Sequence, residues 1–524
     1  MRSNRIGFML VLAVLASVLA SAPTGASAAP KSPVVGTDKG PVRGVAIGDM
    51  QAFLGIPYAA APIGDLRWRP PQEHAGWHGV LDASGFGAHC PQVATPYGTP
   101  STTEDCLFLN VFTPAKTNHG RPHLLPVMFW IHGGGLVVGL SDGYDPAKLV
   151  AQDVAVVTIN YRLGELGFLA HPALAAESPT GASGNYGLMD QQAAMRWVQR
   201  NIRAFGGDPD NVTIFGESAG GLSVHSQLAS PVAAGLFHKA IVESGAYSLI
   251  QPTLAVAEAA GTAFATGAGC PGQTAACLRS LSVAAILAAQ TAPTMVPNLD
   301  GFVLPLTVRS AFTSGQFNRV PVIEGSNHDE WRLFVAQTEA TTHVPLTAAG
   351  YVPAIAATLG VPLPVAAGIA LEYPLADYPS PSVALGAVGT DVVFSCNARI
   401  SSRLLSTFVP TYQYEFNDPN APMLFFPPVS FPTGAYHASE LQYIFDLTGT
   451  PITSPGLTPA QQNLSDAMVG YWTRFARVGD PNSAVEPAWP RYGMSDQLQS
   501  LEPSMPTTKT GFAVDHKCAF WGLN

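Results

Sequence analysis

Phe215-Gly216-Glu217-Ser218-Ala219-Gly220 reads as the end of a strand, a sharp turn and the start of a helix. The preceding run, Asn211-Val212-Thr213-Ile214-Phe215, is apolar and β-branched, as a buried strand should be. The following run, Gly220 to Leu228, suits a helix packed closely on that strand. Glycines flank Ser218 where the backbone is strained and other backbone passes close by. The pattern predicts a serine held at the apex of a strand–turn–helix unit.

Further strands and helices are expected on both sides of this unit. The buried-strand candidates are Leu125–His132, Val154–Tyr161, His238–Gly245, Val320–Gly325 and Thr411–Phe416. Leu188–Phe205 has helical spacing with one apolar stripe. This alternation predicts an α/β fold with a large, mostly parallel central sheet and helices on both faces. Residues 246–310 and 335–410 are rich in Ala, Pro and Leu, and we expect helical insertions there within a single domain spanning residues 29–524.

Composition and the N-terminal segment narrow the function class. The 524 residues carry a net charge of −10 and no run of Lys or Arg, which argues against a nucleic-acid partner. Arg2 and Arg5 precede the apolar run Ile6–Ala20, and small residues follow up to Ala28. This pattern predicts a secretory signal peptide over residues 1–28 and a secreted protein, in an extracellular or periplasm-like compartment. The apolar run is short for a membrane span, and no second stretch of spanning length is expected.

Six cysteines lie after the predicted signal peptide. An even number in an exported chain suggests disulfides, and six cysteines allow 15 pairings. Sequence proximity favours Cys90–Cys106 and Cys270–Cys277, which leaves Cys396–Cys518. No C-x-x-C motif or His/Cys cluster supports a metal site, so we expect no metal.

A serine nucleophile needs a base, and the base needs a third group that fixes its tautomer. In α/β-hydrolases these groups follow in the order Ser, Asp or Glu, His. Asp329 and Glu330 come directly after a predicted strand and both qualify as the acid, although a surface turn carrying acids explains them equally well. Later histidines are His343, in a predicted insertion, His437, in a loop after a strand, and His516, beside Cys518. Position favours His437 over His516.

The glycine run after the first long predicted strand is the candidate oxyanion hole. His132-Gly133-Gly134-Gly135 matches the loop that supplies backbone amides in this fold, because glycine lets an amide approach a developing charge. The expected donors are the amides of Gly134, Gly135 and Ala219. A flexible loop is the simpler alternative for a triple glycine.

Taken together, these residues resemble the type-B carboxylesterase family, which includes the cholinesterases and bile-salt-type lipases. Two long matches carry the resemblance, Phe205–Gly220 and Glu104–Pro114. Shorter ones support it at 55–59, 67–70, 160–164 and 184–191, and the likeness covers about residues 33–524.

The resemblance implies an α/β-hydrolase fold and a serine ester hydrolase without metal or organic cofactor, acting on small-molecule esters. It assigns Ser218, Glu330 and His437 as the catalytic residues and supports the three disulfides. It also implies structural ion pairs Arg67–Glu104 and Arg162–Asp190, a serine behind the acid at Ser244, and a site-lining or structural role for Glu217. The chain departs from the family at Trp331, where glycine is usual.

The resemblance also bears on the substrate. Cholinesterases carry a tryptophan in the loop closed by the first disulfide, where it binds a quaternary ammonium group. The segment Cys90–Cys106 contains Tyr97 but no Trp, so choline esters are not the expected substrates. Short- to medium-chain acyl esters are favoured, with a lipase of the same family or a non-catalytic adhesion protein as alternatives.

Overall fold

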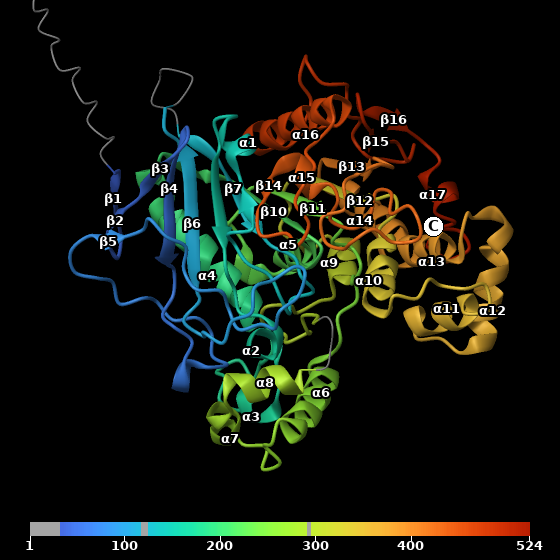
Figure 1. The fold of residues 1–524 in the computed structure, drawn as a ribbon. Coiled ribbons are helices and arrows are strands. Elements are labelled where there is room, and N and C mark those ends of the chain that lie inside the picture. The colour runs from blue at the N-terminus through green and yellow to red at the C-terminus, as the bar shows by residue number, and fades with distance from the viewer. Residues whose placement is uncertain (1–31, 117–123, 291–294, 524) are drawn as a thin grey trace, which may run out of the picture.

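A computed structural model describes residues 32–116, 124–290 and 295–523. The predicted signal peptide lies outside these residues. Among them, one mixed sheet of 11 strands forms the centre of the molecule, in the order β16-β15-β13-β12-β11-β10-β7-β9-β6-β4-β3 (Figure 1). The seven strands from β9 to β15 in this order pair in parallel, whereas the strands at both ends pair antiparallel. The predicted α/β architecture is therefore confirmed.

The predicted strands all appear in the sheet. Their bounds are β7 (Leu125–Ile131), β9 (Ala155–Ile159), β10 (Gly207–Glu217), β11 (Lys239–Glu243), β12 (Val322–Asn327) and β13 (Thr411–Phe416). The remaining strands of the sheet are β3 (Val45–Ile47), β4 (Met50–Pro57), β6 (Phe108–Pro114), β15 (Leu498–Leu501) and β16 (Thr507–Lys509). β10 is longer than predicted, and its pairing with β7 is irregular between Gly207 and Val212.

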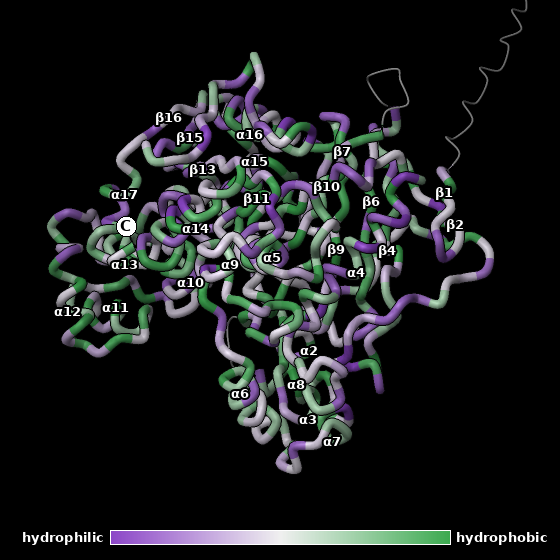
Figure 2. Tube along the Cα trace, turned by 180° about the vertical axis from the view of Figure 1, so that it is seen from behind, coloured by the Kyte–Doolittle hydropathy of each residue, from purple (hydrophilic) through white to green (hydrophobic). Residues whose placement is uncertain are grey.

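Alternate side chains of β7 show how the sheet separates two cores. Val127, Phe129 and Ile131 join a core that includes the apolar stripe of α4 (Tyr186–Asn201) and one side of α5 (Ala219–Ala229). Met128 and Trp130 face the opposite core, together with α16 (Pro459–Val478). This period of two is what a strand buried on both faces requires. The tube in Figure 2 shows hydrophobic stretches running through these central strands.

The two segments rich in Ala, Pro and Leu contain helices outside the sheet (Figure 1). The first contains α6 (Leu254–Gly267), α7 (Ala275–Ser280) and α8 (Val283–Ala289). The second includes α10 (Arg332–Thr342), α11 (Tyr351–Leu359), α12 (Leu363–Glu372), α13 (Pro381–Gly389) and α14 (Cys396–Ser406).

One sequence expectation about membrane spans needs correction. The continuous helical stretch Pro381–Ser406 is long and apolar enough to cross a membrane, although no second such stretch was expected. α11 and the segment Leu363–Asp377 pass the same test only as a sharply bent pair. The most apolar part of Pro381–Ser406 is 78% buried inside the protein, so its apolar side chains belong to the core. Hydropathy alone does not distinguish a helix in a protein core from a membrane-spanning helix.

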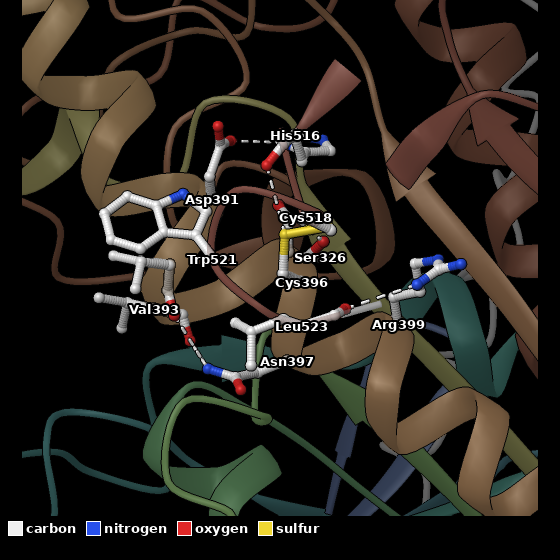
Figure 3. The surroundings of a disulfide bond; sticks show 12 residues. Ser326, Asp391, Val393, Cys396, Asn397, Arg399, His516, Cys518, Trp521 and Leu523 are labelled. Carbon is white, nitrogen blue, oxygen red and sulfur yellow. Dashed lines mark hydrogen bonds and ion pairs between the residues drawn. A yellow bond between two sulfur atoms is a disulfide. The ribbon is translucent and has the colours of Figure 1, made fainter. Parts of the chain in front are cut away.

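All three predicted disulfides are present: Cys90–Cys106, Cys270–Cys277 and Cys396–Cys518. The third joins the start of α14 to the C-terminal segment, and Figure 3 shows its surroundings. Both predicted ion pairs are also present. Arg67 contacts Glu104 with Nε to Oε2 at 2.6 Å, and Arg162 contacts Asp190 through two nitrogens, each at 2.7 Å from a carboxylate oxygen.

Candidate active site

Ser218 lies at the turn between β10 and α5, as predicted. Its φ of 55° and ψ of −119° place it in a strained backbone conformation that non-glycine residues rarely adopt. The flanking glycines are required by space, because a Cβ on Gly216 would lie 2.6 Å from the Ile131 carbonyl oxygen and one on Gly220 would overlap that same oxygen. The turn thus holds the Ser218 side chain, which is partly exposed, at the carboxyl end of the central strands.

Glu330 and His437 come together from two neighbouring strands of the sheet. Glu330 follows β12, and His437 lies in the loop between β13 and α15 (Leu441–Ile444). The Nδ1 atom of His437 lies 2.6 Å from Glu330 Oε2. The other Glu330 oxygen accepts a hydrogen bond from the Asn327 amide at 2.7 Å. Both oxygens of this fully buried carboxylate are therefore fixed, and the histidine ring is oriented by one of them.

The competing acid contacts different groups. Asp329 accepts a hydrogen bond from the Ala435 amide at 3.0 Å, and its other oxygen lies 3.0 Å from His328 Nδ1 and 2.8 Å from Arg332 Nη2. It therefore ties the loop before His437 to the segment that carries Glu330. Its partners place it in a supporting position, away from the His437 ring nitrogens.

The competing histidines are elsewhere. His343 is exposed at the end of α10. His516 is buried, with Nδ1 at 2.7 Å from Asp391 Oδ1 and Nε2 at 2.6 Å from Glu415 Oε1. Among the described residues, neither ring contacts Ser218 or Glu330, so His437 alone of the three meets the candidate acid.

The Nε2 atom of His437 faces Glu217. It lies 3.2 Å from Glu217 Oε1, but the alignment is not that of a hydrogen bond, and this buried oxygen has no hydrogen-bond partner among the described residues. Within the same residues, no hydrogen bond joins Ser218 to His437. The His437 Nε2 atom therefore faces the Glu217 carboxylate, and among the described residues no hydrogen bond occupies this nitrogen.

The buried charges of this site shift each other's titration. Burial lowers the pKa of His437, but the carboxylates of Glu217 and Glu330 outweigh burial and the net pKa is raised. Burial raises the pKa of Glu217 to about 7, against the attraction of the His437 ring. The charge of each group therefore affects the protonation of the other, as is common in active sites.

The predicted oxyanion loop lies next to the elbow. Gly134 and Gly135 follow β7 with φ of 97° and 64°, which only glycine adopts without strain. A Cβ on Gly133 would lie 3.1 Å from Ser218 Cβ, so the loop and the nucleophile are in close contact. No hydrogen bond among the described residues occupies the amides of Gly134 and Gly135. They remain available as donors, beside the amide of Ala219 at the first position of α5.

Ser244 directly follows β11, the strand between β10, which leads to Ser218, and β12, which leads to Glu330. It is buried directly after β11, with φ of 51°, and its amide donates to the Gly325 carbonyl at 2.9 Å. Its hydroxyl has no hydrogen-bond partner among the described residues. It therefore lies behind the acid segment, where the resemblance places it.

Aromatic rings line one side of His437. The rings of Phe394 and Phe334 lie with centroids 4.9 Å and 5.4 Å from the imidazole, and Trp331 packs on Phe334 at 4.6 Å. Trp331, the departure from the family pattern, fits because residue 389 is glycine, where any Cβ would overlap the indole. The tryptophan therefore extends an apolar wall beside the candidate base.

Sequence reasoning missed the supporting contacts of this site. Asn327 holds Glu330 through its amide and the His437 segment through its side chain, which donates to the Tyr436 carbonyl at 2.9 Å and also contacts Glu440. Phe394 lies in a segment expected only as a helical insertion, residues 335–410, and Phe334 directly precedes that segment. Asn327 could have been suspected, because it ends the strand that precedes the acid.

Comparisons with known proteins agree with this geometry. The model of the carboxylesterase family matches residues 31–521. An acylcarnitine hydrolase of Mus musculus is 36% identical over 506 residues, covering 90% of this chain and 88% of the relative. A fumonisin B1 esterase of Sphingopyxis macrogoltabida is 35% identical, covering 89% and 85%. The structure of a PNB esterase superposes with a TM-score of 0.77 at 32% identity, covering 92% of this chain and 98% of the esterase.

The fold class expected from the elbow, the α/β-hydrolase fold, agrees with these solved structures. Because the family model matches nearly the whole described chain, this protein belongs to the carboxylesterase family and is a carboxylic ester hydrolase.

Proposed function

We propose that the protein is a secreted serine carboxylesterase that forms an acyl-enzyme on Ser218. The observation that carries the proposal is the Glu330–His437 pair, at 2.6 Å, beside a serine on a strained elbow. His437 must turn its Nε2 from Glu217 toward the serine hydroxyl before it can act as base. In the same step the imidazole becomes charged, and Glu330 stabilises that charge.

The reaction proceeds in two halves. The Ser218 oxygen attacks the ester carbonyl while His437 takes the serine proton, and the amides of Gly134, Gly135 and Ala219 stabilise the resulting oxyanion. His437 then protonates the leaving alcohol, and the acyl group remains on Ser218. Water repeats the sequence, with His437 again as base, and releases the carboxylic acid.

Short- to medium-chain acyl esters are the proposed substrates. The apolar wall of Phe334, Phe394 and Trp331 next to His437 suits an apolar acyl or alcohol group of limited size. A lipase that acts on emulsified long-chain esters is the second candidate.

Secretion remains part of the proposal. The three disulfides support it, because such bonds persist mainly in oxidising compartments. The proposed mature chain is a single domain over residues 29–524.

The test is an ester panel measured with wild type and Ser218→Ala. We expect hydrolysis of soluble p-nitrophenyl esters with C2–C8 acyl groups, faster than that of emulsified long-chain esters, and loss of activity in the folded variant. Full activity in Ser218→Ala would refute the serine mechanism. Preference for emulsified long chains would replace the esterase by the lipase.

A further inference from the structure

A second cluster of histidines and carboxylates lies outside the proposed active site, where the C-terminal segment meets the strand ends of β12 and β13. It contains His328, directly after β12, Glu415 in β13, and Asp515 and His516 at the end of α17 (Phe512–Asp515). Figure 3 shows His516 above the Cys396–Cys518 disulfide, with Asp391 beside it. Because these residues are far apart in the sequence, a search for local metal motifs does not find them.

Both imidazole rings are oriented in the same way. His516 Nδ1 lies 2.7 Å from Asp391 Oδ1, and His328 Nδ1 lies 3.0 Å from Asp329 Oδ1. A carboxylate on one ring nitrogen fixes the ring and increases the basicity of the other nitrogen. This is the support that metal-binding histidines usually have, and here it occurs twice in one cluster.

The other ring nitrogens, the Nε2 atoms, meet further carboxylates. His328 Nε2 lies 3.6 Å from Asp515 Oδ2, and His516 Nε2 lies 2.6 Å from Glu415 Oε1. One possible ligand atom from each of His328, Asp515 and His516 lies within 4.8 Å of the other two. Two imidazoles and a carboxylate are a common ligand set for Zn²⁺, and Glu415 is a fourth candidate ligand beside His516.

The charge of the cluster favours a dication. Four carboxylates, those of Asp329, Asp391, Glu415 and Asp515, surround the two rings, and Arg332 neutralises part of Asp329. The carboxylates outnumber the single arginine of the cluster, so the cluster attracts a divalent cation.

Solvent reaches one side of the cluster. The Asp515 side chain is 62% exposed and that of His328 is 38% exposed. A cavity of ≈ 430 Å³ is lined by Glu415, Phe512 and Asp515, among others, so an ion can reach the carboxylates of Asp515 and Glu415 there. Lys509 also lines this cavity, but its ammonium group is paired with Glu502 at 3.4 Å.

We propose that His328, Asp515 and His516 bind one divalent transition-metal ion, with Zn²⁺ as the best-suited ion. Each imidazole binds the ion through a deprotonated ring nitrogen, any proton on that nitrogen passes to solvent, and no redox step is involved. The site links the C-terminal segment, two residues before Cys518, to the segment two residues before Glu330. The bound ion therefore stabilises the fold at the edge of the active site without touching the substrate.

The test uses the full-length mature protein stripped with a chelator and then titrated with ZnCl₂ or CoCl₂ by calorimetry, with metal content measured after dialysis. We expect one ion per chain, a raised Tm, and proton release seen as a dependence of the heat on the buffer. His328→Ala and Asp515→Asn should each weaken binding at least tenfold, while circular dichroism checks that they fold. His78→Ala, which changes an exposed histidine elsewhere, is the matched control.

His437→Ala separates this site from metal capture in the active site. Binding that survives His437→Ala and His78→Ala but weakens in His328→Ala and Asp515→Asn supports the proposal. The absence of stoichiometric binding in the wild type would overturn it. Unchanged affinity in both ligand variants, or binding lost in His437→Ala, would overturn it too.

Discussion

His437 and His516 are both buried histidines between two carboxylates, yet the surroundings of their Nε2 atoms differ. The Nε2 atom of His516 is closed by a hydrogen bond to Glu415 at 2.6 Å. That of His437 meets Glu217 at 3.2 Å without hydrogen-bond alignment, beside a partly exposed serine. A histidine whose two ring nitrogens are both hydrogen-bonded to carboxylates, like His516, stabilises the fold or binds an ion in place of its protons. A histidine with one ring nitrogen free of hydrogen bonds, like His437, can accept and donate a proton. This difference distinguishes the candidate active site from the His516 cluster.

The largest expected effect contrasts the two histidines directly. His437→Ala should lower kcat/KM for p-nitrophenyl acetate by about 10⁴–10⁶-fold, because the base is lost. His516→Ala should leave kcat/KM per folded molecule within about tenfold of wild type, since its ring does not reach the reacting atoms. Stopped-flow or steady-state assays on protein quantified by its folded fraction measure both. Equal losses of kcat/KM in His437→Ala and His516→Ala would contradict the assignment of His437 as the base.

The second prediction concerns Glu330, the candidate acid that contacts His437. Glu330→Gln keeps the shape of the side chain but removes the charge that orients and stabilises the His437 ring. We expect kcat/KM to fall by about 10²–10⁴-fold with little change in Tm. Asp329→Asn is the comparison, because Asp329 touches the His437 loop but not the ring. A larger activity loss in Asp329→Asn than in Glu330→Gln would exchange their assignments.

The third prediction concerns the contribution of His516 to the stability of the fold. In protein freed of metal by a chelator, His516→Ala leaves Asp391 and Glu415 buried without their cation, which should lower the free energy of unfolding by about 3–5 kcal/mol. Because the folded pKa of His516 is raised to about 10, this contribution is complete below the unfolded value of about 6.5 and is lost as pH rises through 10. Chemical denaturation at pH 6 and pH 10 measures it. A difference that grows with pH would contradict the assignment.

The smallest expected effect is a shift in the pH profile. kcat/KM should fall at low pH, because a protonated His437 cannot act as base, and the midpoint should lie above the ordinary histidine pKa of 6.5. Glu217→Gln removes a nearby negative charge, lowers the pKa of His437 and should move this midpoint to lower pH. Assays from pH 5 to 9 with Glu73→Gln, an exposed control, measure the shift. An unchanged or higher midpoint would show that Glu217 does not tune His437.

The sequence predicted the catalytic region better than its surroundings, for physical reasons. The elbow at Ser218, the strand before Glu330 and the loop of His437 depend on local patterns of glycine, β-branched residues and strand ends. The carboxylates around His516 come from distant segments, so no local pattern connects Asp391 with Glu415. Likewise the contact of Glu217 with His437, rather than with the fold alone, depends on a side-chain direction that spacing does not encode.

Covalent labelling with a fluorophosphonate, followed by peptide mass spectrometry, tests whether Ser218 is the nucleophile and His437 its base. A single adduct on Ser218 is expected in the wild type and in His516→Ala, with labelling strongly slowed in His437→Ala and absent in Ser218→Ala. No adduct on Ser218 in the folded wild type, or equal labelling rates in His437→Ala and His516→Ala, would contradict the account.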